Sequence, residues 1–180
     1  MYSVIRLLHQ GWKKNDGREL AAPFSPSQLA SSPLAPPFPL HELSTENSWL
    51  ETPVTGLPAP MYLAGASTSS LDLAHALVAS DVLPEWGSVI VHTQSSGRGQ
   101  LRRNWVSPSG NIYAALRLPM QGVFTSEAAA LGMGALLAHG LDAAGYPVHL
   151  KWPNDLLQHG NASGVSSWRK VGGTLLEERA

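Results

Sequence analysis

The sequence predicts a domain in which helices pack against one mixed β-sheet, and three observations support this. From residue 61 onward, short apolar runs alternate with segments of helical periodicity. Several connections are short and carry polar motifs, which favours a mixed sheet with helices packed against it. The chain has 180 residues and is 43% hydrophobic, so it is long enough to bury one core.

The order of the elements follows from the apolar pattern. Strands are expected where apolar and β-branched residues run together, at 61–65, 87–94, 111–118, 148–152 and 171–178. A helix is expected over 70–80, after a serine-rich cap, because its apolar residues recur at helical spacing. A second helix is expected over 125–145, which begins with Thr, Ser and Glu and closes at a glycine.

The first 60 residues differ in composition from the rest of the chain. Nine of the 14 prolines lie in residues 23–60. Each proline removes a backbone donor and biases its predecessor toward extended geometry, so neither a regular helix nor a central strand is expected there. We expect residues 1–60 to be a mostly irregular leader and residues 61–180 to be the domain. The leader either wraps the domain, is partly disordered, or links it to a separate module.

Charge and composition exclude several classes of function. The formal net charge of -1 removes any global electrostatic case for binding nucleic acid or an anionic membrane. The chain has no cysteine, which rules out disulfides and thiolate zinc sites, and its seven histidines show no metal-ligand spacing. The longest apolar stretch, 128–141, is too short for a bilayer, and no signal peptide is evident, so a cytoplasmic location is expected.

An arginine-rich glycine segment, "SSGRGQLRRNWVSPSGN" at 95–111, is the first candidate site. Arg98, Arg102 and Arg103 supply forked donors that match phosphate or carboxylate oxygens. Gly97 and Gly99 permit positive φ and let backbone N–H groups approach an anion. No other positive residue lies between Arg18 and Arg98, so the positive charge is concentrated in this loop. The alternative is an ordinary exposed hairpin.

Three further motifs combine polar and small residues. "KWPND" at 151–155 fixes a cation, an amide and a carboxylate at a corner, or is a structural turn. "KVGG" at 170–173 places a lysine before two glycines that allow the close approach of a ligand or another backbone, or mark a ligand-free bulge. "GASTSS" at 65–70 caps the first helix and can also donate hydrogen bonds to a small polar ligand.

In this order, the motifs resemble the catalytic domain of biotin protein ligases, members of the biotin/lipoate ligase superfamily. The matching residues are Ser67-Thr68-Ser69, Gln94, "GRG" at 97–99 with Arg103 and Trp105, "SPSGN" at 107–111, "KWPND" at 151–155 and "KVGG" at 170–173. The resemblance implies an α+β fold with a mixed, mostly antiparallel sheet, related to class II aminoacyl-tRNA synthetases. Lipoate ligases share the fold but differ in the glycine-rich loop, so the biotin branch is favoured.

The resemblance also implies a reaction in two steps. The carboxylate of biotin attacks the α-phosphate of ATP with Mg2+ present, and the resulting biotinyl-5'-AMP acylates a lysine of a biotin carboxyl carrier protein or domain. An alternative is a remnant that binds biotin or its adenylate without catalysis, and a second is a lipoate-type protein ligase. DNA binding is not expected, because the prolines of the leader would break the helices of a helix-turn-helix.

The family's roles fall on particular residues of this chain. The catalytic groups are expected to be Lys170, Arg98, Lys151 and Asp155. The biotin contacts are expected to be Ser67, Thr68, Ser69, Gln94, Arg98, Gly99, Gln100, Lys170, Gly172 and Gly173. The contacts to ATP and the adenylate are expected to be Arg98, Arg103, Trp105, Asn154 and Lys170. No resident metal ligand is expected.

The sequence departs from the family pattern at four places. Ser69 stands where Asn is usual, and Gln100 replaces a common Arg. The connection from Asp155 to Lys170 is longer than usual, and its Gly and Ser content predicts an extended surface hairpin. The chain ends at Ala180, where biotin ligases continue with further strands, so a shortened domain is expected. A second copy of the chain could cover its exposed sheet edge as a homodimer.

Overall fold

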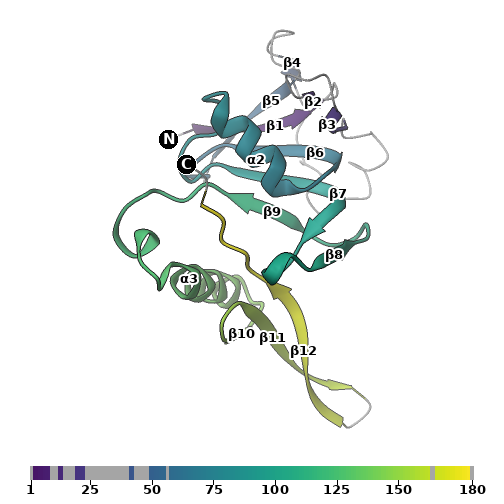
Figure 1. Ribbon diagram of the computed structural model, residues 1–180, viewed down its shortest axis with the longest axis vertical. Coiled ribbons are helices and arrows are strands. Elements are labelled where there is room, and N and C mark those ends of the chain that lie inside the picture. Colours follow the sequence, from purple (N-terminus) through teal and green to yellow (C-terminus); the bar gives the residue numbers. More distant parts are fainter. Residues whose placement is uncertain are drawn as a thin grey trace. The chain divides into compact units, whose positions relative to one another are not determined.

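The computed structural model describes residues 2–8, 12–13, 19–22, 41–42, 49–55, 57–162 and 165–178. The chain forms two compact units, Met1–Leu118 and Pro119–Ala180, and each has its own sheet (Figure 1). The predicted α+β class with a mixed sheet is confirmed. The prediction of one sheet is wrong, because the strands of the second unit pair only among themselves within the described residues.

The first unit is built on a sheet of nine strands among the residues described. These are β1 (Tyr2–Leu8), β2 (Trp12–Lys13), β3 (Glu19–Ala21), β4 (His41–Glu42), β5 (Trp49–Thr55), β6 (Met61–Ser67), β7 (Ser88–Arg98), β8 (Asn104–Ser107) and β9 (Tyr113–Leu116). Strand β6 runs parallel to β1 and β7, and the remaining pairs are antiparallel. The parallel pair β6–β7 needs a crossover, which the helix between them provides.

Two long strands lie in the segment expected to be irregular. Strand β1 pairs with β5 over seven residues, and β1 also pairs with β6, so these strands belong to the same sheet as the rest of the first unit. The expectation of irregular structure is wrong for them because only Pro53, opposite Val4, falls within either strand. The proline-rich residues 23–40 lie outside the part of the chain that the structure describes.

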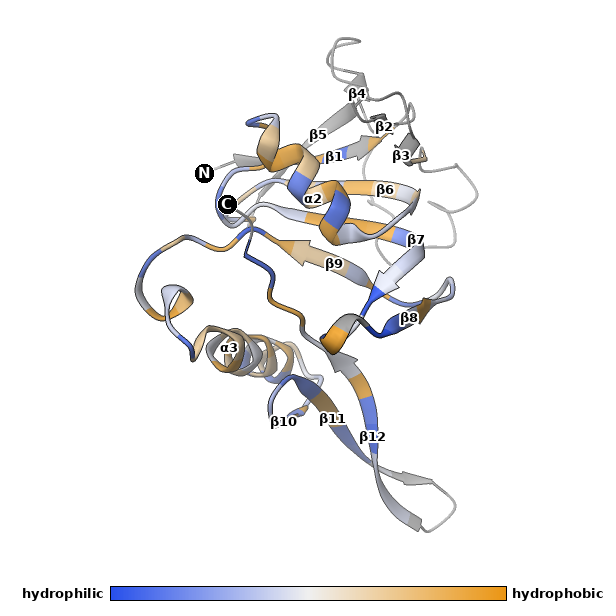
Figure 2. Ribbon diagram, in the orientation of Figure 1, coloured by the Kyte–Doolittle hydropathy of each residue, from blue (hydrophilic) through white to orange (hydrophobic). Residues whose placement is uncertain are grey.

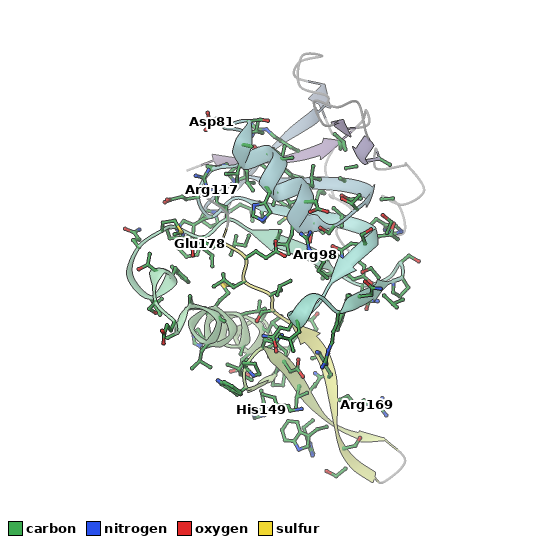
Figure 3. All side chains as sticks on the ribbon, viewed as in Figure 1. Asp81, Arg98, Arg117, His149, Arg169 and Glu178 are labelled. Atoms are coloured by element: carbon green, nitrogen blue, oxygen red, sulfur yellow. The ribbon has the colours of Figure 1, made fainter. Side chains whose placement is uncertain are left out.

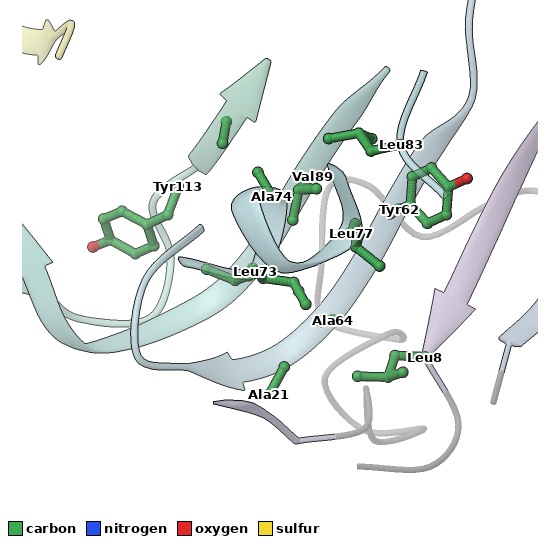
Figure 4. Close-up of a cluster of buried hydrophobic side chains, with 12 residues drawn as sticks. Leu8, Ala21, Tyr62, Ala64, Leu73, Ala74, Leu77, Leu83, Val89 and Tyr113 are labelled. Carbon is green, nitrogen blue, oxygen red and sulfur yellow. The ribbon is translucent and has the colours of Figure 1, made fainter. Parts of the chain in front are cut away.

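Helix α2 (Ser70–Ala79) covers the sheet of the first unit and closes its core. The helix begins where Ser69 caps it and ends before Asp81, which has a φ of 54°. Leu73 and Leu77 point from the helix into a buried cluster that includes Tyr62 and Val89 (Figure 4). Hydrophobic residues accordingly follow β6, β7 and the helix (Figure 2).

The second unit pairs a helix with a small sheet. It contains the 3-10 turn η2 (Gly122–Thr125), helix α3 (Ala129–Ala143) and the antiparallel strands β10 (His149–Lys151), β11 (Asp155–Ala162) and β12 (Val165–Gly173). Leu150 packs so closely on α3 that a Cβ at Gly134 would lie 2.9 Å from its Cδ1 atom. Neither α2 nor α3 is long and apolar enough to span a bilayer.

Three predictions in the second unit can be compared with the structure. The surface hairpin between Asp155 and Lys170 is confirmed as β11–β12. The strand predicted over 171–178 is wrong in its bounds, because β12 ends at Gly173 and the apolar pair that follows is outside the ladder. The helix predicted from residue 125 begins only at Ala129, because η2 occupies the preceding turn.

The buried position of Leu77 predicts a large loss of stability when its side chain is shortened. Leu77 is fully buried, so Leu77→Ala should lower the free energy of unfolding by about 3 kcal/mol through lost burial and a new cavity. Urea unfolding followed by tryptophan fluorescence measures this. Val106 is 85% exposed in the same unit, and Val106→Ala should change the value by less than about 1 kcal/mol. Equal losses in the two variants would contradict the described core.

Candidate functional site

The Gly-Arg-Gly segment lies at the end of a strand pair rather than in an open loop. Strand β7 continues through Arg98, the turn η1 (Gln100–Arg102) reverses the chain, and β8 pairs back so that Gly97 faces Trp105. The predicted loop at 95–111 is therefore wrong at the parts that pair, where the structure has the hairpin that was the alternative, because ladder bonds satisfy their backbone groups. Gln100 and Arg103 lie in the turn and just after it, beside the strand that carries Trp105.

The glycines of this segment serve a purpose other than the predicted one. Neither Gly97 nor Gly99 has a positive φ; Leu101 adopts it instead, with a φ of 56° and its side chain 86% exposed. A Cβ at Gly97 would lie 2.6 Å from both the Ser107 hydroxyl and the Trp105 carbonyl oxygen. Gly97 is therefore required for close approach of the two strands.

The register of the parallel strands brings two predicted motifs together. Ser67 at the end of β6 pairs with Gln94 of β7. The Gln94 side chain accepts a hydrogen bond from the Ser70 backbone N–H at 2.8 Å and donates one to the Ser107 hydroxyl at 2.9 Å. Because parallel strands end at the same edge of a sheet, the serine-rich segment and Gln94 form one polar cluster there.

The serine-rich segment is shaped by the start of α2. The Ser69 hydroxyl accepts the Asp72 backbone N–H at 3.0 Å, which makes Ser69 the N-cap. The buried Ser67 hydroxyl donates to the Ser69 carbonyl at 3.1 Å. The Thr68 hydroxyl donates to the Asp72 carboxylate at 2.9 Å. The capping role predicted for this segment is confirmed, and three hydroxyls are fixed at one helix end.

Arg98 reaches this cluster from β7. Its Nη1 atom lies 2.9 Å from Oδ1 of Asp72 and forms an ion pair, and its Nη2 atom lies 3.4 Å from the Ser69 hydroxyl (Figure 3 labels Arg98). Both charged side chains are mostly buried, with 31% of Arg98 and 20% of Asp72 exposed. The structure thus gathers five predicted site residues of the first unit at the start of α2: Ser67, Thr68, Ser69, Gln94 and Arg98.

Asp72 is a charged group that the sequence analysis did not select. Partial burial raises the pKa of the Asp72 carboxyl, but the hydrogen bond from Thr68, together with the charge and hydrogen bond of Arg98, outweighs burial and holds this pKa below its ordinary value. Its position three residues after the cap serine is the signal that could have identified it. Ser70 and Ser107, which hold Gln94, were missed as well.

The second unit brings the lysine of "KVGG" to the aspartate of "KWPND". Lys170 Nζ lies 2.6 Å from Oδ1 of Asp155, on neighbouring strands. The ladder pairs Leu156 with Gly172 but Leu157 with Lys170, so Val171 is an extra residue in β12. This bulge places Lys170 on the same face of the sheet as Asp155. Without it, the lysine would point to the opposite face.

The two glycines after Lys170 leave room on opposite faces of β12. A Cβ at Gly173 would lie 3.5 Å from Nζ and Cε of Lys170, so the lysine passes over this glycine on its way to Asp155. A Cβ at Gly172 would lie 3.3 Å from Cδ1 of the buried Leu156. The close approach of a ligand to these glycines stays a prediction, and the bulge that was its alternative is present.

The corner of "KWPND" is tied to the chain after β12. Asn154 donates from Nδ2 to the Thr174 carbonyl at 2.9 Å, and the Thr174 N–H donates to the Asn154 carbonyl at 2.9 Å. Lys151 pairs with Asp155 in the ladder, so both side chains share the face that carries Lys170, and the Lys151 side chain is exposed. Asn154 is thus held by Thr174 and Asp155 by Lys170, whereas Lys151 shares only the sheet face, so the predicted fixed relation of cation, amide and carboxylate stays a prediction for Lys151.

Most of the predicted site residues thus form two clusters, one in each compact unit, whereas Gly99, Gln100, Arg103 and Trp105 lie at the turn η1 and on β8. The first presents an arginine among hydroxyls and an amide, and the second presents two lysines beside a carboxylate. Each arrangement suits an anionic ligand, because charged donors strengthen hydrogen bonds to phosphate or carboxylate oxygens. Over the described residues, no three His, Asp or Glu side chains gather in a group that could hold a metal ion.

Comparison with known proteins gives a family match and partial relatives. Residues 59–180 match the family model of the Biotin/lipoate A/B protein ligase family. The biotin–[acetyl-CoA-carboxylase] ligase of Paracoccus denitrificans is 36% identical over 95 residues, which cover 49% of this chain and 35% of that protein. The bifunctional ligase/repressor BirA of Bacillus subtilis is 33% identical over 118 residues, covering 63% and 33%. The chain spans about a third of the length of these curated relatives.

Solved structures show a similar fold. The biotin protein ligase of Leishmania major in complex with biotinyl-5-AMP has a TM-score of 0.53 and 25% sequence identity, and the match covers 66% of this chain and 52% of that one. The same ligase in complex with biotin has a TM-score of 0.51 and 27% identity, covering 67% and 52%. These structures support the α+β fold with a mixed sheet.

The close approach at Gly97 predicts that an added methyl group will disrupt the strand pair. Gly97→Ala should lower the free energy of unfolding by about 1–3 kcal/mol, because the new Cβ overlaps backbone as well as the Ser107 hydroxyl. Gly99→Ala is the matched control, since its Cβ would have no neighbour nearer than 3.5 Å. Thermal unfolding compares the two variants. Similar melting temperatures for both would contradict the described packing.

The lowered pKa of Asp72 predicts a specific dependence of stability on pH. Its carboxylate stabilises the fold fully above the unfolded-state pKa of about 3.9, and this contribution is lost as the pH falls through the lower folded-state pKa. Asp72→Asn should therefore destabilise the chain most at neutral pH and progressively less toward about pH 3. The exposed Asp81→Asn variant is the control. A Tm difference that stays constant with pH would argue against the ion pair.

Proposed function

Because the chain belongs to the biotin/lipoate A/B protein ligase family, we propose that it is an ATP-dependent biotin-protein ligase domain. The observation that carries the proposal is the cluster at the start of α2, where Arg98 lies among Ser69, Thr68 and Gln94. Relatives with this activity in their names support the choice of biotin over lipoate. Because β1 and β5 belong to the sheet of the first unit, we propose that the catalytic domain includes them as well as residues 61–180, and the use of ATP fits a cytoplasmic location.

In the first proposed step, a carboxylate oxygen of biotin attacks the α-phosphorus of ATP. A new oxygen–phosphorus bond forms, the bond from the α-phosphorus to the bridging oxygen breaks, and pyrophosphate leaves with the bonding electrons. Mg2+ enters with the phosphates as part of the nucleotide substrate. Two anions, the biotin carboxylate and the triphosphate of ATP, must approach each other in this step. Preordered cations near the reacting atoms lower the activation barrier, because they stabilise the negative charge that develops there.

The proposed roles start from the side chains of the first cluster, which hydrogen bonds and an ion pair hold in place. The serine-rich segment and Gln94 bind biotin through their hydroxyl and amide groups, and Arg98 binds the carboxylate and then the adenylate phosphate. Gly99 and Gln100 contribute the turn that covers biotin, and Trp105 and Arg103 contact the adenylate. Such positioning converts a bimolecular attack into an effectively unimolecular one.

Lys170 supplies the second cation in this proposal. Asp155 fixes its ammonium group at 2.6 Å, and Gly173 leaves the space through which it passes. Lys170 then contacts the reacting carboxylate and phosphate, while Lys151 adds positive charge on the same sheet face. Asn154 holds the corner in place and contacts the nucleotide, and Gly172, whose Cβ position faces the buried Leu156, contacts biotin through its backbone.

In the second proposed step, the ε-amine of an acceptor lysine attacks the acyl carbon of biotinyl-5'-AMP. A carbon–nitrogen bond forms, the bond between the acyl carbon and the phosphate oxygen breaks, and AMP leaves. The amine proton passes to solvent or to a carboxylate such as Asp155. The acceptor is a biotin carboxyl carrier protein or domain.

One experiment distinguishes the proposed ligase from two other functions, a non-catalytic binding protein and a lipoate-type ligase. Calorimetry on the 180-residue chain should be performed with biotin, with lipoate, and with biotin plus ATP and Mg2+, together with an assay for pyrophosphate. Pyrophosphate released only with biotin supports the ligase. Biotin binding without pyrophosphate supports a non-catalytic binding protein, which Ser69 favours because its hydroxyl serves as the helix cap. Preference for lipoate would overturn the biotin assignment.

The proposed role of Lys170 predicts a large loss in the first step. Lys170→Gln should slow biotin-dependent pyrophosphate release about a hundredfold or more, because one preordered charged donor typically stabilises a transition state by about 3 kcal/mol. Arg169→Gln is the matched control, since Arg169 is exposed and its pairing with Gln158 puts it on the face of β12 opposite Lys170. Equal rates in both variants, with circular dichroism unchanged, would exclude Lys170 from adenylation.

A further inference from the structure

Asp72 joins two residues of the proposed ligand-binding cluster. Its Oδ2 atom accepts the Thr68 hydroxyl at 2.9 Å, and its Oδ1 atom lies 2.9 Å from Nη1 of Arg98. Its backbone N–H also bonds the Ser69 hydroxyl. One carboxylate therefore fixes the side chains of two residues that come from different elements, the β6–α2 connection and the end of β7.

The position of Asp72 in the first turn of α2 has a structural explanation, stabilisation of the helix start, besides a functional one. An acidic residue in the first turn of a helix is favoured by the helix dipole and the unpaired N–H groups there. In a capping box, the side chain at this position bonds back to the cap residue's N–H. The carboxylate of Asp72 also contacts two side chains of the cluster, Thr68 and Arg98, and helix capping does not require either contact.

We propose that Asp72 is a positioning residue that holds Arg98 and Thr68 in their binding geometry before the ligand arrives. The inference rests on the proposed function and adds a residue to its site. An arginine side chain is flexible, and ordering it on binding costs affinity. A guanidinium carries five N–H donors, so one that donates to Asp72 can donate to an anionic ligand at the same time.

The negative charge of Asp72 would by itself disfavour an anionic ligand. That charge is offset by Arg98 at 2.9 Å and by the hydrogen bond from Thr68. A neutralised pair exerts a weaker field on a third group than an isolated charge does, whereas the orientation of Arg98 acts on the ligand directly. Removal of the carboxylate should therefore weaken binding rather than strengthen it.

The test compares biotin affinity in single and double variants. Asp72→Asn keeps the size of the side chain. With its amide N–H2 toward the Thr68 hydroxyl, its Oδ1 remains a neutral acceptor for Arg98, so the variant removes the charge of the ion pair. We expect the Kd for biotin, measured by calorimetry, to rise about fivefold to tenfold, because a hydrogen bond to a charged partner is worth about 1 kcal/mol more than one to a neutral partner. In an Arg98→Ala background, Asp72→Asn should add less than about twofold.

Two controls separate positioning from general damage. Asp81→Asn makes the same change of charge at an exposed residue and should leave the Kd unchanged within about twofold. Asp72→Glu keeps the carboxylate and should recover most of the affinity. In the free protein, phenylglyoxal should modify Arg98 several times faster in Asp72→Asn than in the wild type, as measured by peptide mapping, because an ordered and paired guanidinium is shielded.

The outcomes distinguish this inference from the proposed function. If the wild type binds biotin and Asp72→Asn binds it equally well or more tightly, the positioning role is overturned while the proposed function stands. Equal losses from Asp72→Asn with and without Arg98 overturn it too, because Asp72 then acts on the fold. If the wild type neither binds biotin nor releases pyrophosphate, the proposed function fails and the inference fails with it.

Discussion

The parallel pairing of β6 with β7 is the constraint on which the first cluster depends. The pairing sets Ser67 beside Gln94 and requires a crossover, and α2 provides that crossover with Ser69, two residues after the end of β6, as its cap. The start of a helix carries unpaired N–H groups, so hydroxyls and a carboxylate are favoured there. The same few residues therefore end a strand, begin a helix and line one edge of the sheet.

Both clusters hold a cation with a carboxylate from another element. Arg98 of β7 is held by Asp72 of α2, and Lys170 of β12 is held by Asp155 of β11. A long cationic side chain loses much conformational entropy when it is fixed. Because the carboxylate fixes it on folding, this entropy is lost before any ligand binds. Each pair is part-exposed, so screening keeps its contribution to stability modest. The pairs therefore matter more for orientation than for folding.

The sequence allowed prediction of the residues of the first cluster but not of how they are joined. The hydroxyl, amide and guanidinium groups of "STS", "Q" and "GRG" indicate a polar site, and the helical periodicity of the apolar residues predicts α2. Asp72 was missed because an aspartate in a first helical turn has an ordinary explanation as a dipole partner. Ser107 was missed because its contact with Gln94 depends on the strand pairing beyond Arg98, which a glycine-rich segment does not predict.

Strand pairing between distant segments was the other limit. The proline content of the first 60 residues pointed away from strands, yet β1 and β5 carry only Pro53 and join the sheet through partners far along the chain. Proline content describes the average over all 60 residues. Strand formation depends only on the seven residues of each strand and on an available edge of a neighbouring strand. The separate sheet of the second unit was missed for a different reason: its three strands pair with their neighbours along the chain, and an apolar pattern does not show which sheet a strand joins.

The spacing of the lysine and the glycines in "KVGG" can be explained only with the β-bulge in β12. In a regular antiparallel ladder, neighbouring residues alternate between faces, so a lysine three residues before Gly173 would lie on the face opposite Asp155. The extra residue Val171 reverses this alternation and brings Lys170 across Gly173 to the carboxylate. A lysine followed by one larger and two small residues thus encodes both the change of face and the space that the ammonium group needs. A substitution that restored the regular register would remove the pair while leaving every residue of it in the chain.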